Sequence, residues 1–121
     1  MNEIILASVK KICNIADPDT SFDAELIMYT NTVLMELMQE WHGMNSAFRV
    51  VDGTETWDQL LGGDTDYEGV KELVGLKVRL MFDTPTSGSV MQAIQDQIKN
   101  LEWRMYFWKD LERIDEEQLQ P

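Results

Sequence analysis

The chain has 121 residues, 44% hydrophobic and 26% charged, as expected for one soluble domain over residues 1–121. Its 22 Asp and Glu residues against 10 Lys and Arg residues give a net charge of −12, which argues against conventional binding of nucleic-acid phosphates. The apolar runs are short and interrupted, so we expect no membrane-spanning segment and no membrane partner.

Two helices are predicted in the first third of the chain. Apolar residues recur at helical steps over residues 2–13, and the turn cluster around Pro18 ends that helix. A second, longer helix is predicted over about 22–42, with Gly43 as its stop. Its apolar stripe consists of Phe22, Leu26, Tyr29, Val33, Leu37 and Trp41. The only cysteine, Cys13, is expected to be a small core residue.

Residues 43–66 form a long irregular loop between the second and third predicted helices. The stretch 47–51 is predicted to be a short strand, and 56–61 a helical turn that Trp57 pins to the core. A connection of this length inside a compact domain is usually functional or mobile. We therefore expect a contact outside the monomer to order it.

The third and fourth predicted helices cover about 66–82 and 87–110, and the short linker with Pro85 folds the fourth back beside the third. The acidic tail from Asp110 to Pro121 lacks the apolar density of a core helix. We expect it to be disordered alone and to fold on a partner. The predicted fold is all-α: a small four-helix domain with a long irregular loop and an acidic C-terminal tail.

The residues needed for catalysis or metal binding are scarce. His42 is the only histidine, and nothing places it near Cys13 as the base of a nucleophile. Two carboxylate pairs at helical spacing lie off the apolar stripes and are expected to face solvent. These pairs are Glu36/Glu40 and Glu68/Glu72. We therefore predict no catalytic residue, cofactor or metal, and no enzyme activity.

Aromatic residues cluster near the end of the fourth helix, on more than one face. Either part of this cluster is an interaction surface, or the core uses unusually large residues. Lys99, Arg104, Lys109 and Arg113 interleave with the aromatics and would allow head-to-tail pairing with an identical neighbour. The candidate subunit or partner contacts are Phe48, Arg49, Trp57, Lys99, Trp103, Arg104, Tyr106, Phe107, Trp108, Leu111 and Ile114.

Several blocks of the sequence, in this order and spacing, resemble the head–tail connector (adaptor) proteins of long-tailed bacteriophages and related prophages. The blocks are residues 19–27 with Asn31, Thr56-Trp57-Asp58, Tyr67 to Phe82, residues 83–87, and Leu101-Glu102-Trp103-Arg104. The resemblance covers nearly the whole chain. Thr84 stands where a proline is expected, a departure that should only loosen the linker.

The resemblance implies a structural protein of the virion, located at the head–tail interface and assembled in the bacterial cytoplasm. Subunits of this kind form a homo-oligomeric ring of about twelve copies beneath the portal protein, although the isolated subunit can stay monomeric. The ring would extend the DNA channel, with DNA as passing cargo, and would dock the next head-completion or tail protein. The alternative is a small acidic protein that inhibits a host DNA-binding enzyme by mimicking DNA. It would need carboxylates in a regular stripe, whereas here they are mixed with basic residues.

Overall fold

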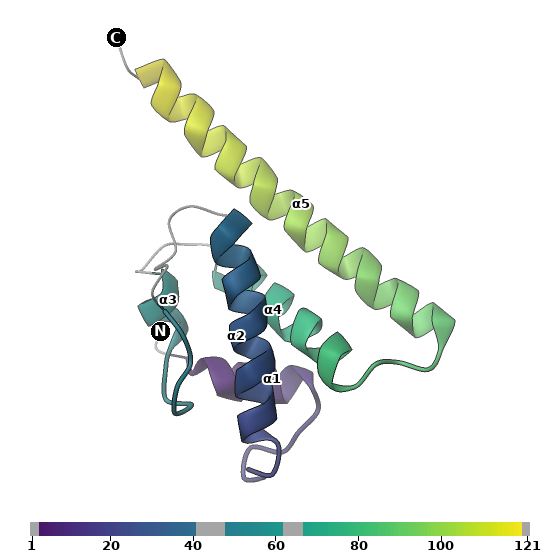
Figure 1. Ribbon diagram of the computed structural model, residues 1–121. Helices are drawn as coiled ribbons and strands as arrows, with labels where there is room; N and C mark the ends of the chain where they lie inside the picture. Colours follow the sequence, from purple (N-terminus) through teal and green to yellow (C-terminus); the bar gives the residue numbers. More distant parts are fainter. Residues whose placement is uncertain (1–2, 41–47, 62–66, 120–121) are drawn as a thin grey trace.

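The computed structural model describes residues 3–40, 48–61 and 67–119, with side chains for 3–39, 48–61 and 69–104. Within these residues the chain forms five helices and no strand, so the all-α prediction is confirmed (Figure 1). The helices are α1 (Ile5–Ile12), α2 (Asp23–Glu40), α3 (Trp57–Leu61), α4 (Tyr67–Phe82) and α5 (Gly88–Leu119).

Helix α4 lies at the centre of the domain and contacts each of the other four described helices. Its apolar residues Val70, Leu73, Val74 and Val78, spaced by one, three and four positions, are buried, and Met81 stays at the surface. Against it pack the buried faces of α1 and α2 and the side chains of α3. Gly75 allows α1 to approach closely, because a Cβ atom there would collide with the Ile12 side chain. The core therefore forms around the residues that the 3.6-residue periodicity selects.

Helix α3 is the helical turn predicted over 56–61. Thr56 and Gln59 cap it reciprocally: the Gln59 amide N–H donates to Thr56 Oγ1 at 3.3 Å, and the Thr56 N–H donates to Gln59 Oε1 at 3.0 Å. An isolated antiparallel bridge between Ile4 and Thr56 holds the start of the chain beside it. Helix α3 is thus held by its N-terminal cap and by the bridge to the start of the chain.

Helix α5 is longer than predicted. It continues to Leu119 instead of ending near residue 110, which gives 32 residues and a length of about 48 Å. The tail is therefore helical over 110–119, and its folding on a partner stays a prediction. Glu, Gln, Leu and Arg are good helix formers, and a helix already begun propagates through them until a breaker such as Pro121. The C-terminal end of α5, yellow in Figure 1, extends beyond the other helices.

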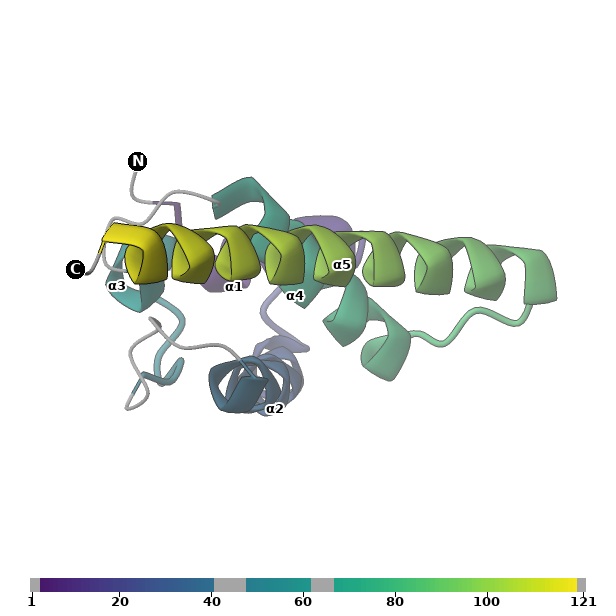
Figure 2. The same cartoon turned by 90° about the horizontal axis from the view of Figure 1, so that it is seen from above.

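Helix α5 runs back across α4, as the short linker predicted (Figure 2). Thr84 Oγ1 donates to the Leu80 carbonyl at 2.8 Å at the end of α4. Ser87 Oγ accepts from the Val90 N–H at 3.4 Å at the start of α5. Each helix end at the linker therefore has a side chain that binds one of its free backbone groups.

The short strand predicted over 47–51 is not formed in its described part, 48–51. The amide of Asn31, on α2, takes both backbone groups of Val50: its Nδ2 donates to the Val50 carbonyl and its Oδ1 accepts from the Val50 N–H, each at 2.8 Å. A side-chain amide thus replaces the neighbouring strand that the β-branched sequence suggested.

Candidate interaction surfaces

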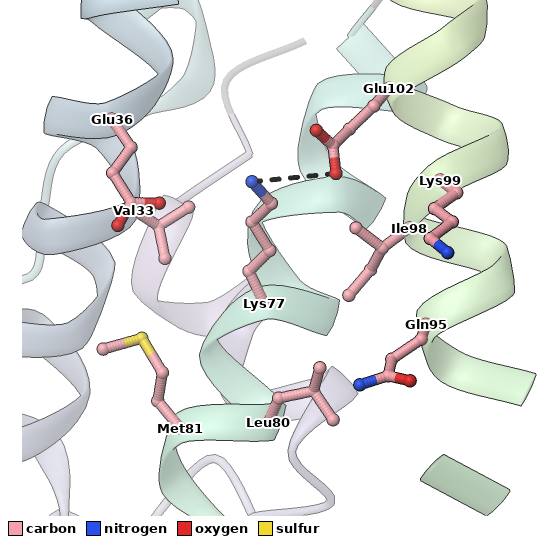
Figure 3. Close-up of a pocket in the computed structure, with 9 residues that line it drawn as sticks. All are labelled: Val33, Glu36, Lys77, Leu80, Met81, Gln95, Ile98, Lys99 and Glu102. Carbon is pink, nitrogen blue, oxygen red and sulfur yellow. Dashed lines mark ion pairs between the residues drawn. The ribbon is translucent and has the colours of Figure 1, made fainter. Parts of the chain in front are cut away.

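A groove of about 530 Å³ lies between α2, α4 and α5. Figure 3 shows α4 as its floor, with α2 and α5 as opposite walls. Its lining consists of Val33 and Glu36 from α2, Lys77, Leu80 and Met81 from α4, and Gln95, Ile98, Lys99 and Glu102 from α5. The groove exists because α5 packs on α4 and leaves the side of α2 uncovered.

The chemistry of the groove is an apolar floor with balanced charges at its rim. Lys77 Nζ lies 3.9 Å from Glu102 Oε1, the ion pair drawn in Figure 3. Glu36 and Lys99 are exposed on opposite walls, and neither forms an ion pair with any described residue. The two acidic and two basic residues cancel, although the chain as a whole carries −12. Such a groove suits an apolar side chain flanked by one charge of each sign.

A second candidate surface is the loop 48–56, which internal hydrogen bonds hold in one conformation. The Glu55 carboxylate accepts from the backbone N–H groups of Val51, Asp52 and Gly53 at 2.7, 3.3 and 3.0 Å. Gly53 has φ 86°, which favours glycine, and a Cβ atom there would collide with the Leu6 side chain. Internal hydrogen bonds therefore hold the described loop 48–56, and a contact outside the monomer for the segment 43–66 stays a prediction.

The tip of this loop presents an apolar side chain to solvent. Val51 is 71% exposed, and the exposed residues Arg49 and Asp52 flank it. Phe48 lies half-buried against the core. A fixed loop that exposes a valine between two opposite charges has the composition of a docking contact.

The predicted contact residues on α5 divide into two groups. Trp103 is 64% exposed, and Lys99 and Arg104 are also exposed. Lys99 and Arg104 are five positions apart, or about 140° around the helix, so these two basic side chains leave α5 on different sides. The side chains of Tyr106, Phe107, Trp108, Leu111 and Ile114 lie outside the described part, although their backbone belongs to α5.

Trp57 is a core residue in this structure, with 0% exposure, so it has no surface to offer a partner. Its indole Nε1–H donates to Ser8 Oγ at 3.0 Å. That hydroxyl lies 3.0 Å from Glu3 Oε1, and Glu3 Oε2 forms an ion pair with Lys71 Nζ at 3.0 Å. This hydrogen-bond chain joins α3, α1 and α4. It confirms that Trp57 pins the turn to the core and removes this residue from the contact set.

Sequence reasoning overlooked the residues that build the loop and the groove. The sequence pattern predicts a strand at Val51 and gives no role to Glu55 or to Lys77. The available signal was the Asp52-Gly53 turn, which leaves the preceding valine without a strand partner. No such signal marks the groove, because it depends on where α5 crosses α4.

The other candidate groups give no sign of catalytic chemistry. Burial raises the pKa of the half-buried Cys13 thiol to about 11, which keeps it protonated near neutral pH. His42 and the side chains of Glu40 and Glu68 lie outside the described residues. Among the residues that are described, no cluster of three metal-ligating side chains occurs, and no helix is long and apolar enough to span a bilayer.

Fold and surfaces together describe a small all-helical domain with a groove that has an apolar floor and a loop that exposes a valine. The model of the phage connector protein family matches residues 5–112, and the chain belongs to that family. It is therefore a structural phage protein, a component of the virion that assembles with portal or tail proteins. The resemblance seen in the sequence is confirmed, and the acidic DNA-mimic alternative has no observation in its favour. No match was found among curated proteins or among solved structures.

Proposed function

We propose that this chain is an adaptor subunit that forms a ring between the portal and the tail. The ring extends the DNA channel and docks the next head-completion or tail protein. Its mechanism is scaffolding, with no catalytic turnover and no cofactor. The observation that carries this proposal is the length of α5 relative to its anchorage on the domain.

Only a short part of α5 is needed to hold it on α4. Among its described side chains, Ile94 and Ile98 are buried and Leu101 is partly buried, whereas the helix runs for 32 residues. The residues beyond 104 extend past the other helices (Figure 1) and include the aromatic cluster and the acidic tail. A helix that exceeds what its own core requires is suited to contacts with other subunits.

The net charge supports the role in DNA passage. A channel wall that repels phosphates lets the duplex slide through. The wall neutralises no phosphates, so no counterions are released and no favourable binding free energy holds the DNA in place. With 22 acidic residues against 10 basic ones, the subunit as a whole repels phosphates. The same charge makes self-association unfavourable except where acidic and basic side chains balance locally.

The direct test combines the purified chain with the portal protein of the same phage. We expect rings on the portal in negative-stain images and a discrete complex in native mass spectra. The double variant Leu111→Ser/Ile114→Ser should fold normally and lose this complex, while Gln97→Ser, an exposed change elsewhere on α5, should keep it. Absence of any complex with the unaltered chain would contradict the proposal.

A further inference from the structure

We infer that the loop tip around Val51 of one copy docks in the groove between α2, α4 and α5 of the next copy. This inference rests on the proposed function as a ring subunit and specifies the contact that joins neighbours. It names a second copy of this chain as the occupant of the groove. The argument uses the placement, the charge and the shape of the two surfaces.

The loop and the groove lie on opposite flanks of α2. Asn31, which holds the loop, and Glu36, which lines the groove, are five positions apart on this helix, or about 140° around its axis. Figures 1 and 2 agree that the segment leading to α3 and the helix α5 stand on different sides of α2. Two different patches on different sides of one subunit give a head-to-tail contact, which closes into a ring when the rotation fits.

The charges of the two surfaces are complementary. The tip carries Arg49 and Asp52 on either side of Val51, and the groove offers Glu36 and Lys99 on opposite walls. Within the described residues, Arg49 forms no ion pair, and the same holds for Glu36 and Lys99. Docking would place Arg49 beside Glu36 and Asp52 beside Lys99. The groove is neutral, and the tip carries −1 once the Glu55 carboxylate that binds its backbone is counted, so this contact involves less repulsion than two strongly acidic surfaces would.

The shape of the tip also fits the groove. The apolar side chains that line it, Leu80, Ile98 and the 41% exposed Met81, would cover Val51. The volume of about 530 Å³ exceeds that of one valine side chain. The hydrogen bonds of Glu55 already fix the loop, so docking orders few additional groups.

A charge-swap experiment tests the pairing of Arg49 with Glu36. The variants Arg49→Glu and Glu36→Arg should each reduce incorporation into portal-bound rings by about tenfold, because like charges then face one another. The double variant in one chain should restore incorporation. An equal mixture of the two single variants should also restore it, since copies that alternate around the ring pair opposite charges at every contact. Lys11→Glu and Glu72→Arg, exposed changes of matched charge away from both surfaces, should have no effect.

A cross-linking experiment identifies the occupant independently. On a Cys13→Ser background, Val51→Cys chains mixed with Met81→Cys chains should form a disulfide between copies in portal-bound rings, whereas Val90→Cys with Met81→Cys should not. If unaltered rings form but neither the swap rescue nor this cross-link occurs, the inference is wrong and the adaptor role stands. A disulfide between Met81→Cys and an Ile114→Cys of a neighbouring copy, or between Met81→Cys and the portal protein, would also overturn the inference. If the unaltered chain forms no ring, the proposed function itself fails.

Discussion

Replacement of Ser8 by alanine tests the buried hydrogen-bond chain that fixes α3 to the rest of the domain. The Ser8 side chain is 3% exposed, and its hydroxyl accepts from the indole Nε1–H of Trp57. Ser8→Ala leaves that N–H buried without an acceptor, at a cost of about 1–3 kcal/mol. Alanine is the better helix former by about 0.5 kcal/mol, so the net loss of unfolding free energy should be about 0.5–2.5 kcal/mol.

The decisive comparison is made in a Trp57→Phe background. Phenylalanine has no N–H group. Removal of the Ser8 hydroxyl in this background therefore leaves no buried donor unpaired, and Ser8→Ala should cost less than about 1 kcal/mol. The two changes should therefore couple by about 1–2 kcal/mol in a double-mutant cycle.

Urea unfolding followed by far-UV circular dichroism gives the four free energies without relying on the altered tryptophan. Thr86→Ala, which removes an exposed hydroxyl, should stay within about 0.5 kcal/mol of the unaltered chain. Equal costs of Ser8→Ala in both backgrounds would show that the indole does not depend on this acceptor, and would refute the argument.

Three further predictions concern other parts of the domain. Gly75→Ala should lower the free energy of unfolding in urea by about 1–3 kcal/mol, because the new methyl group collides with Ile12. Ile12→Val should relieve part of this loss. If the free-energy changes of the two substitutions simply add in the double variant, the contact is contradicted. The hydrogen bond from Lys71 lowers the pKa of Glu3 below its ordinary 4.5, so the stability it adds is present above about pH 4.5 and lost as the pH falls through the folded pKa. Lys71→Met should flatten that acid-side loss in melting curves, and an unchanged slope would exclude the pair as its source. The pKa of about 11 leaves Cys13 with about one hundredth of the thiolate of a group at 9.0, so at pH 8 iodoacetamide should react far more slowly with the folded than with the urea-unfolded chain; equal rates would contradict this.

The helical core was predictable from the sequence because it depends on local periodicity. The positions chosen on α4, such as Leu73 and Val78, are fully buried, and Leu26 and Leu37 on α2 are too. Spacing of three and four residues fixes which side of a helix is apolar, and any compact packing must bury that side. The helices and most of their inward residues therefore followed from the chain alone.

Features that depend on contacts distant in sequence were not predictable in the same way. Lys10 is 4% exposed, since its ammonium group pairs with Asp23 at 3.1 Å and donates to the Asp17 carbonyl at 2.8 Å. No periodicity indicates such a pair. The conformation of 48–56 likewise depends on Asn31, nineteen positions before Val50. The extra turns of α5 were missed for a different reason, because apolar density was taken as the requirement for helix where propensity sufficed.

Few described side chains of α5 pack against the core of the domain, and these are Ile94, Ile98 and Leu101. Burial of Ile94 and Ile98 contributes about 1.5–3 kcal/mol each, which is enough to seat the first half of α5 on α4 within a domain stabilised by roughly 5–15 kcal/mol. The side chains described as holding α5 on α4 therefore all lie in the first half of the helix. The same crossing of α5 over α4 creates the groove beside α2. Helix α5 thus supplies both the C-terminal end that extends beyond the other helices and one wall of the groove that we assign to the neighbouring copy. A shift of α5 on α4 would alter both contacts together.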